Sequence, residues 1–343
     1  MLTLLWCTLR NVRWQLVLLT LFGGLLLAAD HPQDEISNGV LRVRLYTPDA
    51  QNGYYRGTRF DWSGMIYSLQ YQGHDYYGPW YDKMDPAVSD FVYRDSEIVA
   101  GPCSWATGPA EEFEVIGYND AAPQGTFIKI GVGRLRKPDS AAYDHYRLYE
   151  IADGGKWSVH KTADRAEFVQ DVGRAGEYTY MYRKVVRLAK DKPQMVIEHS
   201  LKNTGRKPIA TNAYVHNFLV LDKLAPGPGL TISFPFAIKA PPLTGDLARI
   251  EGNRIVYLKT LTGEDRVTTP IEGFGSTAKD YDIRFENRQA GMGLRITGDR
   301  PIIKAGLWSI RSNVSVEPYV EISVAPGKEF TWNLTYDYFA LKQ

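Results

Sequence analysis

Cysteine is nearly absent from this chain of 343 residues, which contains Cys7 and Cys103. Cys7 precedes an apolar N-terminal segment whose removal is predicted below, so the mature chain keeps one cysteine. A single cysteine forms no intramolecular disulfide, and a zinc site built from several cysteines is excluded. A disulfide-free exported protein of this size fits a bacterial periplasm.

An excess of charge is also missing. The 40 Lys and Arg residues balance 39 Asp and Glu residues, which argues against a nucleic-acid-binding protein that works through a large basic face. Hydrophobic residues make up 44% and charged residues 23% of the chain, as in soluble globular proteins and unlike disordered ones. No apolar stripe with helical spacing extends over about 12 residues of the mature chain.

Several familiar catalytic motifs are lacking. The chain has no Gly-x-Ser-x-Gly elbow, no phosphate-binding Gly-rich loop and no His-Glu-x-x-His. No cofactor is implied, and no cluster of Asp, Glu and His has the spacing of a catalytic metal site. A calcium ion held by loop carboxylates such as Asp82 and Asp85 is compatible with the sequence. Chemistry must therefore come from scattered histidines and carboxylates.

Residues 1–29 have the features of a secretory signal peptide. Two arginines precede an apolar run, residues 14–29, which ends in small residues before a polar start. The run is short for a spanning helix, which needs about 20 residues. We expect a periplasmic or secreted protein, with no stable membrane insertion once the signal is cleaved. Because Leu27 departs from the usual cleavage pattern, an uncleaved N-terminal anchor is the alternative.

Short segments of alternating polar and apolar residues fill the rest of the chain. Examples are residues 40–46, 127–132, 194–201 and 330–339. Aromatic residues make up 13% of the chain, and 31 Gly and 19 Pro supply turns, a pattern typical of many short strands. The sequence predicts an all-β protein with one large sandwich-like domain, residues 33–343.

A candidate acid lies on one of these predicted strands. Residues 201–205, Leu-Lys-Asn-Thr-Gly, predict a tight hairpin turn, and the strand after it carries Tyr214, His216 and Asn217. A histidine among such neighbours can donate a proton with a pKa that they set. A hydrogen-bonded structural histidine is the alternative.

A candidate base lies near the C-terminus. Glu317 follows an alternating strand, and Pro318 is expected to stop that strand from pairing further. A carboxylate at such a bend is well placed to project into a cleft. The alternative is an exposed charge at a strand end, and Glu321 is a rival candidate for the base.

Aromatic residues gather in residues 54–62 and 76–81. Aromatic rings stack on the apolar faces of sugar rings, and Arg and Asp hydrogen-bond sugar hydroxyls. Arg59, Asp61 and Trp62 are therefore candidate sugar contacts. Plain packing of aromatic side chains is the alternative.

Taken together, these segments resemble the galactose mutarotase-like superfamily, which includes the aldose 1-epimerases. The likeness covers nearly the whole mature chain. It rests on an Arg-bearing segment, a Glu-Phe segment, a Leu-x-Asn-x-Gly turn followed by a histidine strand, and a glutamate strand followed by a Pro-Gly turn: residues 56–66, 108–113, 201–218 and 316–328. The resemblance implies a large antiparallel β-supersandwich.

The resemblance also implies a chemistry. In the epimerases a glutamate removes the proton from the anomeric hydroxyl and a histidine protonates the ring oxygen, so the ring opens and closes as the other anomer. Glu317 is the expected base and His216 the expected acid. The expected substrate contacts are Arg59, Asp61, Trp62, Tyr214 and Asn217.

The chain departs from the epimerases at their second histidine, which precedes the catalytic one. Residues 101–105 contain none, and His145 and His160 lie later in a different context. We expect a sugar or oligosaccharide as ligand, no nucleic acid, and anomer interconversion as the function. The alternatives are a non-catalytic glycan-binding protein on the same fold, or a protein related to polysaccharide lyases or hydrolases. The sequence does not indicate an oligomeric state.

Overall fold

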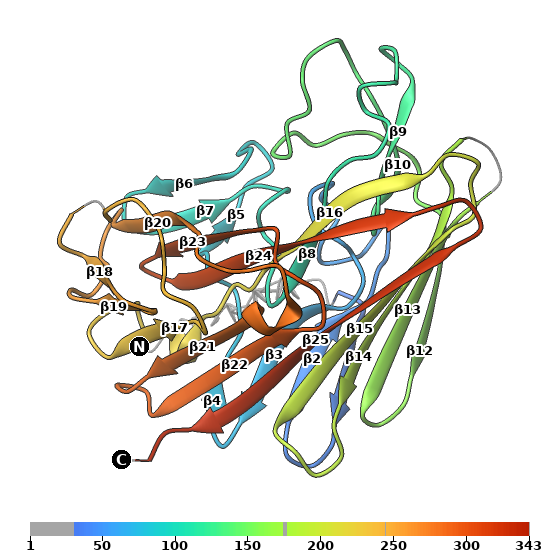
Figure 1. Cartoon of the computed structure of the whole chain (residues 1–343). Coiled ribbons are helices and arrows are strands. Elements are labelled where there is room, and N and C mark those ends of the chain that lie inside the picture. The colour runs from blue at the N-terminus through green and yellow to red at the C-terminus, as the bar shows by residue number, and fades with distance from the viewer. Residues whose placement is uncertain (1–30, 174–176, 244, 343) are drawn as a thin grey trace, which may run out of the picture. The chain divides into compact units, whose positions relative to one another are not determined.

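The computed structural model describes residues 31–173, 177–243 and 245–342, so the predicted signal peptide, residues 1–29, lies outside the described residues. β-Strands are the main secondary structure of the described chain (Figure 1). The helical segments among these residues are two short 3₁₀ turns, η1 (Leu221–Lys223) and η2 (Ala278–Asp280). The expected all-β fold is confirmed. No helix in the described ranges is long and apolar enough to cross a membrane.

The largest sheet has ten strands, and every neighbouring pair is antiparallel. The last strand of the chain lies in its middle (Figure 1). In spatial order the strands are β12 (Lys156–Lys161), β13 (Arg165–Val172), β14 (Tyr180–Leu188), β15 (Gln194–Asn203), β25 (Glu329–Ala340), β22 (Met292–Gly298), β21 (Asp282–Asn287), β17 (Leu230–Ser233), β19 (Arg254–Tyr257) and β18 (Ala248–Glu251).

A second, five-stranded sheet is also antiparallel and packs against the first. In spatial order its strands are β20 (Arg266–Ile271), β23 (Lys304–Ile310), β24 (Asn313–Val324), β16 (Ile209–His216) and β8 (Ala110–Phe113).

Three smaller sheets complete the described strands. They contain one parallel pair, β5 with β7. The first sheet consists of β1 (Gln33–Ser37), β2 (Arg42–Tyr46), β3 (Met65–Tyr71) and β4 (His74–Asp75); the second of β11 (Ile151–Asp153), β10 (Gly133–Arg136) and β9 (Thr126–Lys129); the third of β5 (Lys83–Met84), β7 (Glu97–Ala100) and β6 (Phe91–Arg94).

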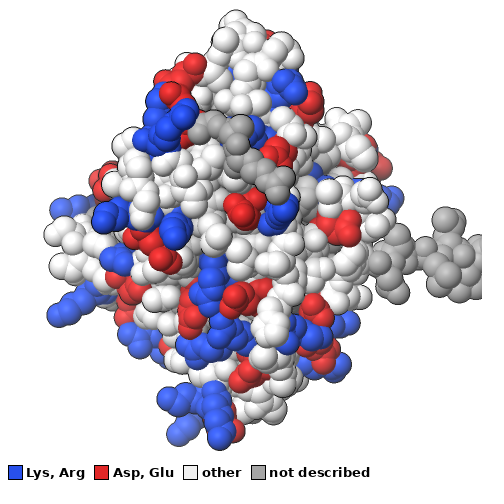
Figure 2. All heavy atoms as spheres, turned by 90° about the vertical axis from the view of Figure 1, so that its right-hand side faces the viewer, with Lys and Arg blue, Asp and Glu red and all other residues white. Residues whose placement is uncertain are grey.

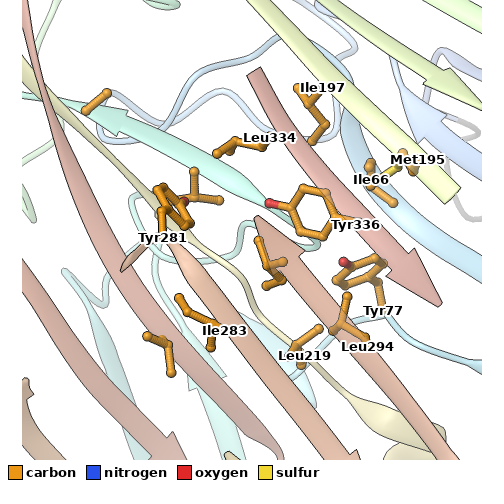
Figure 3. Close-up of a cluster of buried hydrophobic side chains, with 14 of the residues drawn as sticks. Ile66, Tyr77, Met195, Ile197, Leu219, Tyr281, Ile283, Leu294, Leu334 and Tyr336 are labelled. Carbon is orange, nitrogen blue, oxygen red and sulfur yellow. The ribbon is translucent and has the colours of Figure 1, made fainter. Parts of the chain in front are cut away.

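The main core lies between the two large sheets. Because side chains alternate along a strand, Ala213 and Val215 of β16 point into this core, where they meet Trp332 and Leu334 of β25. Figure 3 shows part of the same core, with Tyr336 among aliphatic side chains from neighbouring strands. The other face of the five-stranded sheet contacts a separate aromatic cluster, to which Tyr214 belongs. The five-stranded sheet is therefore covered on both faces.

A buried charge cluster lies in the main core. Glu111 of β8 contacts the Lys184 ammonium group, and its Oε1 lies 3.1 Å from His199 Nε2. Burial favours the neutral form of Glu111, but Lys184 and His199 outweigh burial and lower the pKa of Glu111 to about 2. Asp61 lies 3.6 Å from Lys184 Nζ, and burial raises the pKa of its carboxyl. These pairs hold together strands from both large sheets.

Charges outside the core are mixed. Figure 2 shows one face of the molecule, on which positive and negative side chains are interspersed. Neighbouring strands pair such charges, as Arg183 pairs with Glu167 and Arg187 with Glu198. The equal numbers of positive and negative residues in the sequence thus correspond to ion pairs between neighbouring strands.

Two local expectations are wrong. Residues 201–205 do not form a hairpin: β15 belongs to the ten-stranded sheet and β16 to the five-stranded sheet, so this segment crosses between sheets. Asn203 Nδ2 fixes the crossing, because it donates hydrogen bonds to the carbonyl groups of Lys207 and Val324 at 2.9 and 2.8 Å. The same Asn-x-Gly sequence leads into a hairpin in one protein and into a connection between two sheets in another. The pairing of the strands on either side of the turn decides which of the two forms.

The strand at Pro318 also differs from the expectation. β24 continues through Pro318, which pairs with Ala305 of β23. On the other edge, the ladder with β16 ends at the pair of Tyr214 and Tyr319. Proline has no N–H group and occurs in strands where a ladder is interrupted. Pairing therefore stops on one edge of β24 only.

We predict that Lys184→Met lowers the free energy of unfolding by about 3–5 kcal/mol, because it leaves the buried carboxylates without their ammonium partner. Urea unfolding followed by tryptophan fluorescence measures the change. Arg284→Ala is the matched control: it breaks the exposed pair of Arg284 and Glu286 and should cost less than about 1 kcal/mol. Equal losses in both variants would contradict a supporting role for the cluster.

Candidate functional site

A cavity of about 370 Å³ lies on the face of the five-stranded sheet that points away from the main core. This volume lies within the range of about 300–1000 Å³ that is usual for small-ligand pockets. Alternate residues of four strands line it, because alternate side chains share one face of a sheet. These residues are Thr268, Pro270, Trp308, Glu317, Tyr319, Tyr214 and His216, and Thr269 and Leu307 of the same strands also reach the cavity.

Loops between the strands form the other walls of the cavity. Residues 54–64 bring Arg59, residues 76–82 bring Trp80, and residues 137–150 bring His145 and Tyr146. Because these segments are far apart in the sequence, pairing of the strands that flank them is needed to bring them together. The site is therefore a product of the whole fold.

His216 and Glu317 are in contact inside this cavity, with 3.1 Å between His216 Nε2 and Glu317 Oε1. They come from neighbouring antiparallel strands, β16 and β24. The ladder between these strands ends at the pair of Tyr214 and Tyr319, and the same register carried two residues further places His216 opposite Glu317. Strand pairing thus positions both groups on one face, at the point where the ladder stops.

The surroundings shift the pKa values of this pair in opposite directions. Burial raises the pKa of Glu317 to about 7, although the positive charge of Arg59 opposes the rise. Burial also lowers the pKa of His216 well below its usual range, and Arg59 adds to that effect. Burial disfavours the charged form of each group. Below a pH of about 7 the proton of the pair therefore resides on Glu317, beside a neutral imidazole.

Aromatic rings enclose the imidazole. The His216 ring stacks on Phe218 at 3.6 Å between centroids, and Trp308 meets it edge-on at 5.1 Å. His216 Nδ1 is buried and has no hydrogen-bond partner among the described residues. A partner at this nitrogen usually stabilises a charged histidine, so the lack of one in the described structure agrees with the lowered pKa.

Glu112 organises the wall next to the pair. Its Oε2 accepts hydrogen bonds from Arg59 Nε at 2.7 Å and from the Tyr214 hydroxyl at 2.6 Å. Its Oε1 accepts one from Lys129 Nζ at 3.1 Å and lies 3.3 Å from His145 Nδ1. Burial favours protonation, but Lys129 and Arg59 hold the pKa of Glu112 well below its ordinary value. Glu112 therefore fixes the direction in which Arg59 and Tyr214 face the cavity.

The structure brings four of the expected site residues together. Arg59, Tyr214, His216 and Glu317 all line the cavity. The rival base, Glu321, is exposed and lies four residues beyond Glu317 on β24, away from this cavity. Of the two carboxylates, Glu317 is the one that meets His216.

Three expected sugar contacts lie elsewhere. Asp61 is buried, and its carboxylate accepts hydrogen bonds from Ser63 and Tyr182 within the charge cluster around Lys184. Trp62 fills the aromatic cluster, where its Nε1 donates to the Gly57 carbonyl at 2.8 Å. Both residues stabilise the fold instead of facing the cavity.

Asn217 also faces away from the cavity. It follows His216, so its side chain points toward the core, where its Nδ2 donates to the Val316 carbonyl at 2.8 Å and its Oδ1 accepts from the Tyr336 hydroxyl at 3.1 Å. Alternation along the chain excludes it from the face that carries His216.

Sequence reasoning missed several lining residues. His145, set aside from its sequence context, lines the cavity next to Tyr146. Asp90 also lines it; burial raises the pKa of Asp90, and its Oδ1 accepts a hydrogen bond from Ser104 at 2.6 Å. The signal that was available is the unusual run Tyr-Asp-His-Tyr at residues 143–146, which lies between two predicted strands.

The carboxylates considered for calcium have other partners. Asp82 accepts a hydrogen bond from the Ile98 amide at 2.7 Å, and Asp85 pairs with Arg94 at 2.6 Å. Within the described ranges, no group of three or more His, Cys, Asp or Glu residues is arranged to hold a metal ion.

Comparison with solved structures gives the class of fold. The chain is similar to the GalM/aldose epimerase homologue from C. elegans, with 13% identity, a TM-score of 0.52, and coverage of 90% of this chain and 99% of that one. It is also similar to the Slr1438 protein from Synechocystis sp. PCC 6803, with 12% identity, a TM-score of 0.52, and coverage of 97% and 100%. No protein-family model and no curated protein matches the sequence. The chain has the galactose mutarotase-like fold, as the sequence predicted.

We predict that the Glu317 carboxyl titrates with a midpoint of about 7, which infrared difference spectra of wild type against Glu317→Gln will measure. The unfolded chain releases this proton near the ordinary value of 4.5. The stability that the protonated carboxyl contributes is therefore complete below about 4.5 and is lost as the pH rises through 7. Glu317→Gln should gain stability relative to wild type at pH 8. A midpoint near 4.5 would contradict the buried setting of the group.

Proposed function

We propose that this protein interconverts the anomers of a sugar, as aldose 1-epimerases do, with His216 and Glu317 as the acid–base pair. The observation that carries the proposal is the contact between these two groups inside a ligand-sized cavity. A mutarotase needs one proton acceptor for the anomeric hydroxyl and one donor for the ring oxygen. Because residues 1–29 are predicted to be a signal peptide, we place the proposed reaction in the periplasm or outside the cell.

The chemistry requires that the pair holds one proton. In the reactive arrangement the proton is on His216 and Glu317 is a carboxylate. Glu317 removes the proton of the anomeric hydroxyl, the bond between C1 and the ring oxygen breaks, and His216 protonates that oxygen. This step leaves Glu317 protonated and His216, 3.1 Å away, neutral, which are the forms that the reverse steps require. The aldehyde rotates, and ring closure by the reverse steps gives the other anomer.

Other lining residues suit a sugar ring. The Arg59 guanidinium offers hydrogen-bond donors, and Asp90 offers an acceptor. Trp80, Phe91 and Trp308 supply aromatic surface on the same cavity. This combination of an apolar surface with a few oriented polar groups is characteristic of small-ligand sites.

We predict that Glu317→Gln and His216→Gln each lower the rate of anomer exchange by about 10²–10⁴-fold, since each removes one partner in proton transfer. Proton NMR of freshly dissolved α-glucose and α-galactose, with and without purified protein, measures the rate.

Glu321→Gln serves as the matched control, because Glu321 is exposed on the same strand as Glu317 and lies away from the cavity, and circular dichroism verifies the fold of every variant. Wild-type protein that binds sugar but accelerates no exchange would contradict catalysis and favour a glycan-binding protein. Loss of activity in Glu317→Gln alone would exclude His216 as the acid.

The pH dependence distinguishes the one-proton pair from a simple carboxylate base. The pair loses its proton at about 7 and gains a second one well below the usual pKa of histidine. We therefore expect kcat/KM for anomer exchange to fall as the pH rises through about 7. A rate that instead increases through 7 would mean that the doubly deprotonated pair is the active form.

A further inference from the structure

A second cavity adjoins the first on the same face of the five-stranded sheet. It measures about 660 Å³ and shares four lining residues with the cavity of the His216–Glu317 pair. The shared residues form two pairs: Tyr214 and Tyr319 on the sheet, and His145 and Tyr146 on the loop of residues 137–150. Because both cavities have both pairs as walls, the two cavities adjoin at these four residues.

The spacing along the strands fits one sugar ring between the reacting pair and this junction. Tyr214 precedes His216 by two residues on β16, and Tyr319 follows Glu317 by two residues on β24. Two residues of a strand span about 7 Å, close to the length of one pyranose ring. Arg59 donates a hydrogen bond to the Tyr214 hydroxyl at 2.8 Å. Its guanidinium therefore lies where the two cavities adjoin.

The second cavity has its own groups for binding a sugar. The Tyr319 ring stacks on Tyr214 at 4.5 Å between centroids, and Lys304 Nζ lies 4.7 Å from the centre of the same ring. Tyr143 adds another ring, and Asn119 adds an amide that donates and accepts hydrogen bonds. A monosaccharide bound at the pair would leave Lys304, Tyr143 and Asn119 unused, because they line the second cavity and not the first.

Charge in the second cavity selects among sugars. Glu114 and Asp144 are exposed there and oppose the single lysine, Lys304, while Glu112 is already paired with Lys129 and Arg59. Glu114 and Asp144, which form no ion pair within the described residues, would repel a phosphate or a uronic acid. The second cavity therefore suits a neutral sugar unit.

We propose that the substrate is a neutral disaccharide or longer oligosaccharide, whose reducing-end ring lies at His216 and Glu317 while the next unit lies in the second cavity. The inference rests on the proposed anomer exchange for the placement of the reducing end. The binding of a second sugar unit is inferred from the adjoining cavities.

Asn119→Trp tests this proposal, because Asn119 is exposed in a turn and lines the second cavity alone. Asp120→Trp, at the next position of the same turn and outside both cavities, is the matched control. Exchange rates are measured on glucose, maltose, cellobiose and lactose, which all present a reducing-end glucose. We expect wild type and Asp120→Trp to act on at least one disaccharide with a kcat/KM at least about tenfold above glucose, a difference in transition-state binding.

Asn119→Trp should lower the kcat/KM for that disaccharide to the kcat/KM for glucose. It should leave the kcat/KM for glucose itself unchanged. Equal kcat/KM for glucose and all three disaccharides in wild type, or an equal loss on glucose in Asn119→Trp, would overturn the proposal.

Saturation-transfer NMR on Glu317→Gln separates this proposal from the proposed activity. Transfer to both rings of a disaccharide, reduced to one ring by the added Asn119→Trp substitution, supports the second unit even if no sugar is exchanged. Transfer to one ring in both proteins, or to none, overturns the second unit even if glucose is exchanged.

Discussion

The structure depends on two neighbouring buried carboxylates that point to opposite faces of β8. A buried charge costs several kcal/mol unless it is paired and hydrogen-bonded. Glu111 points into the main core, where Lys184 and His199 neutralise it and tie the two large sheets together. Glu112 points to the second cavity, where Arg59 and Lys129 neutralise it. One short strand thus couples the sandwich to the site.

The same balance between burial and charge sets the chemistry of the cavity. In water the carboxyl of Glu317 would be charged at neutral pH and the imidazole of His216 would be charged in part, and burial disfavours both charges. The proton of the pair therefore resides on Glu317, which releases it at about 7, beside a neutral imidazole. Arg59 counteracts this effect on Glu317 and reinforces it on His216. Such pairs of groups with displaced pKa values are typical of acid–base sites.

The fold alone does not define the activity. At 12–13% identity the similar structures establish the architecture, and this architecture supports more than one function. The two side chains that meet in the cavity support anomer exchange. The second cavity, which adjoins the first at Tyr214 and Tyr319, supports an oligosaccharide as the substrate.

The sequence by itself determined the all-β fold and the strands that carry His216 and Glu317, because both follow from local alternation and turn residues. It did not show that Arg59 lines the cavity while Asp61 and Trp62 do not, or that His216 lines it while Asn217 does not. Only the tertiary structure decided which face each side chain shares, which sheet follows the turn at residues 201–205, and that His145 reaches the site. Such contacts depend on pairing between distant strands, and local sequence carries no record of that pairing.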